Sequence, residues 1–251
     1  MTDPLRQAYL DALGVQVWVR RGKGAQSAPA AEAAVPAAAA AARPAAERPT
    51  QAVAEPAVAT APVIPADWDG LAAAVAGCTA CPLHQSRTQT VFGVGNRNAD
   101  WLVIGEAPGA EEDRRGEPFV GRAGQLLDAM LRAVGLDRNQ AYIANILKCR
   151  PPNNRDPRPD EVEACAGFLN RQIELIRPRL ILAVGRIAAQ NLLHSDAPIG
   201  RLRGRVHRLE PEGIPVVVTY HPAYLLRSPG EKRKAWADLL LARSLVAEAA
   251  P

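Results

Sequence analysis

Four cysteines in this chain have the spacing of ligands to a metal centre: Cys78, Cys81, Cys149 and Cys165. The first two form a Cys-x-x-Cys pair, which lets two thiolates converge on one centre, and a distant second pair can complete a four-thiolate cage. An iron–sulfur cluster and a zinc site both fit this order, because both are held by four thiolates. Four unconnected buried cysteines, or a redox pair formed by the first two alone, are the alternatives that the pattern leaves open.

A second group of residues that could do chemistry follows four apolar runs. Glu106 lies in the turn 105–109, where two glycines and a proline direct backbone N–H groups into a crevice. Asn145 follows the next run, and its amide can donate and accept in one plane, as the recognition of a nucleobase edge requires. Gly185-Arg186 follows the third run and His221 the fourth. A lone histidine or asparagine is more often structural, but four such features at successive strand ends predict a site.

The four apolar runs that position these side chains are predicted to be buried strands, at residues 101–105, 141–147, 180–185 and 215–220. Helical patterns separate the runs, at residues 125–131, 159–176 and 186–194. Strands that alternate with helices predict a parallel sheet covered on both faces. The expected fold class is therefore α/β, with three α/β/α layers around a central four-stranded parallel sheet. In such a sheet the ligand site lies at the carboxyl ends of the strands.

Composition divides the 251-residue chain into three predicted parts. Residues 1–21 carry apolar side chains at helical spacing and then an alternating segment, which predicts a short helix–strand peptide that either docks on the main domain or binds a partner. Residues 22–66 are dominated by Ala and Pro, so we expect an extended linker, with a helix over the alanine run as the competing interpretation. Residues 67–251 have a size that suits one compact domain.

The chain carries a formal net charge of +4, and its sequence pI is near 9.1. This modest basic excess is almost wholly arginine, and it suits a polyanionic partner without requiring one. The sequence contains no run of 18 apolar residues and no secretory leader, so we expect a cytoplasmic protein. In a reducing compartment, four cysteines are better explained as metal ligands than as disulfides.

Four motifs together resemble the family 4 uracil-DNA glycosylases, the iron–sulfur branch of bacteria and archaea: GEAPG at 105–109, GEPFVGRAGQLL at 116–127, NILKCRPP at 145–152 and HPAYLLR at 221–227. The resemblance extends from about Cys78 to Leu245 and includes the four cysteines in the family's order. It implies a monofunctional enzyme that flips uracil out of DNA and hydrolyses its N-glycosidic bond, which initiates base excision repair. It also implies that the cysteines hold a structural 4Fe–4S cluster.

The resemblance assigns the recognition of uracil to a small set of residues around the crevice. It implies that Asn145 reads the uracil edge, that Phe119 stacks on the ring, and that His221 stabilises the departing uracil anion. Gly105 belongs to the same expected uracil-binding set. The alternative for Phe119 is an ordinary core residue, because aromatic side chains are usually buried for packing.

The residue that activates water is left open by the resemblance. Glu106 is the expected water-positioning carboxylate, and it also belongs to the expected uracil-binding set. Glu112 is the second candidate, with a solvated acidic turn as its equally weighted alternative. A better-known branch carries an aspartate where this chain has Ala107, which is itself expected to line the uracil pocket.

The expected partner is uracil-containing DNA, single- or double-stranded. By the resemblance, Leu225 or Leu226 fills the gap left by the flipped base. The residues expected to face phosphates are basic: Arg201, Arg203, Arg205, His207 and Arg227. A solvated charged face is the alternative for the segment 201–205. We expect a monomer that associates with the nucleoid.

Three other functions are alternatives to uracil excision with turnover. A non-catalytic nucleic-acid-binding module of the same fold is the main alternative. A zinc enzyme is a weaker one, because the expected catalytic groups lie away from the cysteines. A third is the superfamily branch that traps uracil covalently through a histidine in a basic loop. The corresponding residues 150–159 contain no histidine here, so we expect turnover.

Overall fold

The computed structural model describes residues 62–248 of the chain. The predictions for the peptide at 1–21 and for most of the linker at 22–66 therefore concern residues outside the described part. The α-helices are α2 (Trp68–Ala76), α3 (Ala110–Arg115), α4 (Arg122–Ala133), α5 (Pro159–Ile176), α6 (Arg186–Leu192), α7 (Ile199–Leu202), α8 (Pro222–Arg227) and α9 (Lys232–Glu248). The strands are β1 (Val94–Gly95), β2 (Trp101–Gly105), β3 (Tyr142–Asn145), β4 (Leu180–Val184), β5 (Val206–Leu209) and β6 (Ile214–Thr219). Short 3-10 helices are η1 (Pro82–Gln85), η2 (Pro152–Asn154) and η3 (Pro229–Glu231).

The described strands form one sheet in the order β1-β3-β2-β4-β6-β5. The four central strands pair in parallel, which confirms the predicted parallel sheet. An antiparallel strand is added at each edge, because β1 pairs with β3 and β5 pairs with β6. Neither edge strand was predicted, since β1 is only two residues long and β5 is only half-buried.

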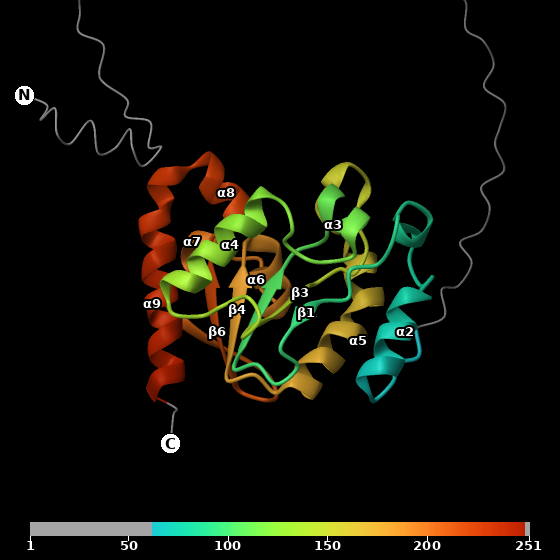
Figure 1. Ribbon diagram of the computed structural model, residues 1–251, viewed down its shortest axis with the longest axis horizontal. Coiled ribbons are helices and arrows are strands. Elements are labelled where there is room, and N and C mark those ends of the chain that lie inside the picture. Colours follow the sequence, from blue (N-terminus) through green and yellow to red (C-terminus); the bar gives the residue numbers. More distant parts are fainter. Residues whose placement is uncertain (1–61, 249–251) are drawn as a thin grey trace, which may run out of the picture. The chain divides into compact units, whose positions relative to one another are not determined.

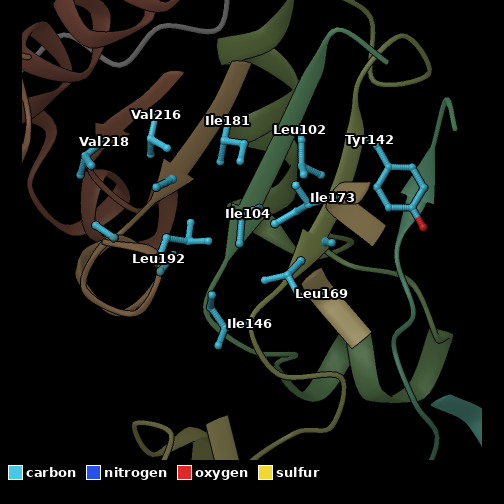
Figure 2. Packing of buried hydrophobic residues seen from close by; sticks show 14 of the residues in the cluster. Leu102, Ile104, Tyr142, Ile146, Leu169, Ile173, Ile181, Leu192, Val216 and Val218 are labelled. Carbon is cyan, nitrogen blue, oxygen red and sulfur yellow. The ribbon is translucent and has the colours of Figure 1, made fainter. Parts of the chain in front are cut away.

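Helices cover both faces of this sheet, as the three-layer prediction required (Figure 1). Along β2, Leu102 and Ile104 point to one face while Trp101 and Val103 point to the other. The first face packs against α5, α6 and α7, and the second against α4, α8 and α9. Figure 2 shows the first of these two cores. Because the central strands are buried on both faces, their sequences read as continuous apolar runs instead of alternating ones.

A third apolar cluster lies between α2 and α5, beside the cysteines. It includes Leu71 and Val75 of α2 and Phe168 of α5. Helix α2 begins where the Asp67 side chain accepts a hydrogen bond from the Gly70 amide at 2.8 Å, which satisfies one free amide of its first turn. The packing therefore brings the Cys-x-x-Cys segment, which follows α2, against the side of the sheet domain.

The carboxyl ends of the four parallel strands meet at one edge of the sheet. Gly105 at the end of β2 lies opposite Asn145 at the end of β3. The pairing continues past the strands, because the amide of Ile146 donates to the Gly105 carbonyl and that of Leu147 to the Glu106 carbonyl, each at 3.0 Å. Glu106 and Asn145 are therefore held side by side by backbone hydrogen bonds.

Candidate functional site

A cleft of about 470 Å³ opens at this edge of the sheet. It contains the side chains that the sequence placed at three of the four strand ends: Glu106, Asn145 and His221. Ala107, Glu112, Phe119 and Arg227 from the predicted set also line it. Its position outside the carboxyl ends of parallel strands is the usual one for a ligand site in an α/β sheet.

Asn145 presents an unused acceptor to this cleft. The residue is 2 % exposed, and its Oδ1 atom has no hydrogen-bond partner among the described residues. An unpaired buried amide oxygen is costly, so it is best explained by a ligand that donates to it. Gly105 makes room for this amide, because a Cβ there would lie 2.5 Å from Asn145 Oδ1.

Phe119 forms one wall of the cleft and is held there in a strained conformation. Its φ of 53° lies in the left-handed region, which is unusual for an aromatic residue. Its carbonyl leaves no space for a side chain at Gly124, where a Cβ would lie only 1.7 Å from the Phe119 oxygen. The Phe119 ring stacks on His221 with centroids 5.6 Å apart and planes 29° apart. Such strain at a cleft wall points to a functional position for the ring.

His221 is fixed in one tautomer. It caps the N-terminus of α8, where its Nδ1 atom accepts a hydrogen bond from the Ala223 amide at 3.1 Å. Burial lowers the pKa of His221 to about 4, and the positive charge of Arg227 acts in the same direction, against a smaller opposite effect of Glu112. The ring is therefore neutral near pH 7 and its proton lies on Nε2, where it can be donated to a ligand.

The surroundings of Glu106 alter the pKa of its carboxylate. Burial raises the pKa of Glu106 to about 7, nearby Asp156 adds to the rise, and Arg186 opposes it. Asp156 and Arg186 themselves form an ion pair at 2.6 Å beside it. A carboxylate poised near neutral pH is suited to act as a general base toward water.

Glu112 has a different place in the site. Its Oε2 atom accepts from the amide of Gly109, and its Oε1 atom accepts from those of Val120 and Gly121, at distances of 3.1 to 3.4 Å. The carboxylate thus joins the turn after β2 to the loop that carries Phe119. Because both oxygens are already engaged, Glu106 is better placed than Glu112 to activate water.

The four cysteines come together beside α2 and α5, and they line one small cavity with Arg87 and Lys148. None of them forms a disulfide. Cys149 Sγ accepts a hydrogen bond from Arg87 Nη1 at 3.1 Å, and Cys165 Sγ accepts one from the Lys148 amide at 3.3 Å. Burial raises the pKa of Cys165 to about 12, so a buried thiolate there needs a compensating positive charge.

The donor set fits a four-thiolate centre, since all four cysteines line one cavity and two of their sulfurs already receive N–H groups. Among residues 62–248, no group of three or more His, Cys, Asp or Glu side chains has the geometry to hold a single metal ion.

Comparison with known proteins identifies the family. The family model described as the uracil DNA glycosylase superfamily matches residues 92–240. A "Type-4 uracil-DNA glycosylase" of Archaeoglobus fulgidus is 47 % identical over 176 residues, which cover 68 % of this chain and 88 % of the relative. The chain belongs to the type-4 uracil-DNA glycosylase family.

A second type-4 relative agrees with this membership, and a type-5 relative is more distant. The type-4 protein of Thermotoga maritima is 45 % identical over 173 residues, which cover 67 % of this chain and 89 % of the relative. A "Type-5 uracil-DNA glycosylase" of Pyrobaculum aerophilum is more distant, at 30 % identity over 146 residues, covering 52 % of this chain and 64 % of the relative. The resemblance inferred from the four motifs is thus confirmed at the level of the family.

Two residues expected to touch DNA are instead engaged inside this type-4 fold. Arg203 donates through Nε and Nη2 to the two carboxylate oxygens of Asp238, at 3.0 and 2.7 Å, and Asp238 is fully buried. The Arg203 guanidinium also lies over the Tyr220 ring, 5.3 Å from the centroid. Leu225 is 1 % exposed and packs in the core under α8. Leu225 therefore belongs to the core, and the guanidinium of Arg203 is held by Asp238.

The residues next to Arg203 and Leu225 in the sequence lie at the surface or line the cleft. Leu226 is 36 % exposed on α8, and Arg227 lines the cleft. Arg201 and Arg205 are exposed on either side of Arg203. His207 uses Nε2 for a hydrogen bond with the Leu202 carbonyl at 2.7 Å.

The cleft of this type-4 protein also contains residues that were not predicted. Asn154, Arg155 and Asp156 reach it from the loop between the third and fourth cysteines, and Tyr224 reaches it from α8. The signal available in the sequence was the loop itself, because it must fold back to bring Cys165 to the other cysteines.

Proposed function

We propose that this chain is a monofunctional uracil-DNA glycosylase that flips uracil out of DNA and hydrolyses its N-glycosidic bond. One observation carries the proposal: the unpaired Asn145 Oδ1 lies in a cleft with a neutral His221 and the stacked ring of Phe119. Uracil offers an N3–H donor, an O2 acceptor and a flat face, which match these three groups in turn. The names of the type-4 relatives support the same substrate.

The mechanism follows from the charges that develop when the bond breaks. Positive charge grows on the sugar and negative charge on the uracil, so catalysis requires a donor at the base and a group that positions water at the sugar. His221 supplies the donor through Nε2–H, because its Nδ1 is occupied by the Ala223 amide. Glu106 supplies the general base, and its negative charge also favours the sugar cation.

The four cysteines are proposed to hold a 4Fe–4S cluster that acts as a structural crosslink. The cluster's thiolates would join the segment after α2 to the loop 149–165, which lines the cleft. Catalysis is assigned to Glu106, Asn145 and His221, none of which is a thiolate ligand. Iron and acid-labile sulfide analysis of the purified protein tests this assignment, and a colourless protein with one equivalent of zinc would contradict it.

The proposed DNA contacts use the exposed members of the predicted set. Leu226 is placed to fill the gap left by the flipped base, while Arg201, Arg205 and Arg227 are placed to contact phosphates. No helix within residues 62–248 is long and apolar enough to cross a membrane. The substrate is proposed to be uracil-containing DNA, with single strands, U·G and U·A pairs as the forms to be compared.

The decisive experiment is the release of free uracil from an oligonucleotide by the purified chain. We expect catalytic turnover with the wild type, and a loss of about 10²–10⁴-fold in the rate with Glu106→Gln. Binding without release, by a protein with Asn145 and His221 intact, would favour the non-catalytic module. A protein–DNA adduct that survives denaturation would favour covalent trapping.

A further inference from the structure

Lys148 is a fully buried cation that the proposed reaction does not use. Its side chain is 1 % exposed, and it is one of the largest fully buried side chains in the described part of the chain. It forms no salt bridge with any Asp or Glu of residues 62–248. Burying an ammonium without a carboxylate partner is costly, so its contacts are expected to do something that an apolar side chain could not.

The ammonium of Lys148 makes two short hydrogen bonds. Nζ donates to the backbone carbonyl of Asn145 at 3.0 Å and to Gln172 Oε1 at 2.7 Å. The Lys148 side chain therefore folds back over the turn that follows β3 and contacts the residue that faces the base. Its own amide donates to Cys165 Sγ, which ties the same residue to the cysteines.

Gln172 extends this network to α5 and to the segment before β1. It is fully buried, and its Nε2 atom donates to the Phe92 carbonyl at 2.9 Å and to Tyr142 Oη at 3.3 Å. The support behind Asn145 is therefore built from three separate parts of the chain. None of these partners lines the cleft, so the network acts on the base only through Asn145.

The peptide unit between Asn145 and Ile146 is held at both of its polar ends. Its carbonyl oxygen accepts from Lys148 Nζ, and its amide donates to the Gly105 carbonyl at 3.0 Å. These two hydrogen bonds restrain the backbone from which the Asn145 side chain extends. Losing one of these two hydrogen bonds would let the backbone of Asn145 shift, and the side-chain amide proposed to read the base would move with it.

We propose that Lys148 is a positioning residue, which orients the base-reading Asn145 by fixing its carbonyl group against Gln172 of α5. The inference rests on the proposed function, because it assumes that Asn145 contacts uracil. It adds a specific consequence: replacing Lys148 should weaken the recognition of the base without weakening the binding of the DNA backbone.

The test compares two oligonucleotides with the Lys148→Met protein, in which both hydrogen bonds are lost and the volume is kept. One oligonucleotide carries 2′-fluoro-2′-deoxyuridine, whose fluorine disfavours the sugar cation and so prevents cleavage. The other carries a tetrahydrofuran abasic site and offers no base. We expect the affinity for the first to fall about tenfold or more, the affinity for the second to stay within about twofold, and kcat for uracil release to fall by about 10²-fold.

Two further variants keep the test decisive. Gln172→Leu leaves the lysine but removes its second acceptor, and we expect a smaller loss with the same selectivity for the uracil analogue. It takes the place of Lys148→Met if that protein does not fold. Leu239→Ala is the control, because Leu239 of α9 is buried in the apolar core on the other face of the sheet, which contains none of the residues of this network. It should lower the melting temperature and leave the ratio of the two affinities unchanged.

The proposal is overturned if the Lys148→Met protein binds both oligonucleotides as the wild type does, or if it loses affinity for both equally. It is also overturned if its iron content falls, since Lys148 would then serve the cysteine site. Failure of the proposed function has a different signature, because the wild type itself would release no uracil and would not prefer the uracil analogue to the abasic site.

Discussion

Gly105 is the residue whose substitution tests the geometry of the base pocket most directly. A Cβ at this position would lie 2.5 Å from Asn145 Oδ1 and 2.6 Å from Phe119 Cζ. The backbone of Gly105 is not in the left-handed region, so Gly105→Ala introduces a steric conflict without backbone strain. The three nearest atoms all belong to the two side chains proposed to contact uracil.

The size of the effect follows from these distances. Non-bonded heavy atoms are at their optimum about 3.5 Å apart, so both Asn145 and Phe119 must move by about 1 Å. A misplacement of this size costs about 10²-fold in rate, or about 2.7 kcal/mol of transition-state stabilisation. The strand itself is buried on both faces and offers little room to adjust, so the displacement should fall on the pocket.

Single-turnover release of uracil from a short oligonucleotide measures this loss. Gly230→Ala is the matched control, since a Cβ there meets no atom within 4 Å and the residue lies away from the sheet. We expect Gly105→Ala to release uracil about 10²-fold more slowly and Gly230→Ala to match the wild type. A Gly105→Ala protein with a rate within about threefold of the wild type would refute the assignment of Asn145 and Phe119 to the base pocket.

Four further outcomes are expected. Because the pKa of Glu106 is raised to about 7, kcat/KM should fall as the pH drops through 7, and this acidic limb should be absent from the pH profile of Glu106→Gln. The same raised pKa means that the native state holds this proton more tightly than the unfolded state, so the free energy of unfolding declines as the pH rises from about 4.5 to 7. The melting temperature of Glu106→Gln should therefore exceed that of the wild type at pH 8 and equal it at pH 4. Arg203→Ala should lower the free energy of unfolding by about 3–5 kcal/mol in urea titrations, because it leaves Asp238 buried and unpaired. Arg205→Ala should change that free energy by less than about 0.5 kcal/mol, while reducing the slope of log K for DNA against log salt by about 0.9; an unchanged slope would exclude a phosphate contact.

The elements of the parallel sheet could be predicted because their burial is written in continuous apolar runs. Strand β2 and helix α5 have the predicted bounds, and β4 ends one residue before its predicted end. The edge strands could not be predicted in the same way. Val206–Leu209 alternates exposed and half-buried residues, and it becomes a strand only because β6 lies beside it.

The side chains that gather in the cleft could also be predicted, because parallel strands bring their carboxyl ends to one edge. What the sequence did not reveal is the partner of each side chain. In the sequence Glu112 has the pattern of an acid in a polar turn, but in the fold its carboxylate accepts hydrogen bonds from the amides of Val120 and Gly121. The sequence does not distinguish Arg203 from its exposed neighbours, but in the fold it forms an ion pair with Asp238 of α9. Such assignments depend on contacts between segments distant in sequence, which neither spacing nor periodicity encodes.

The distribution of the four cysteines has a consequence for the order of events during protein synthesis. Cys165 lies on α5 and is added to the growing chain 84 residues after Cys81 (165 minus 81). At a translation rate of about 5–20 residues per second, Cys165 is synthesised about 4–17 s after Cys81. Assembly of the proposed 4Fe–4S cluster would therefore be a late step, which follows synthesis of β2 and β3. Until then the Cys-x-x-Cys pair is open to oxidation, so the yield of active protein should depend on how reducing the cell is during translation.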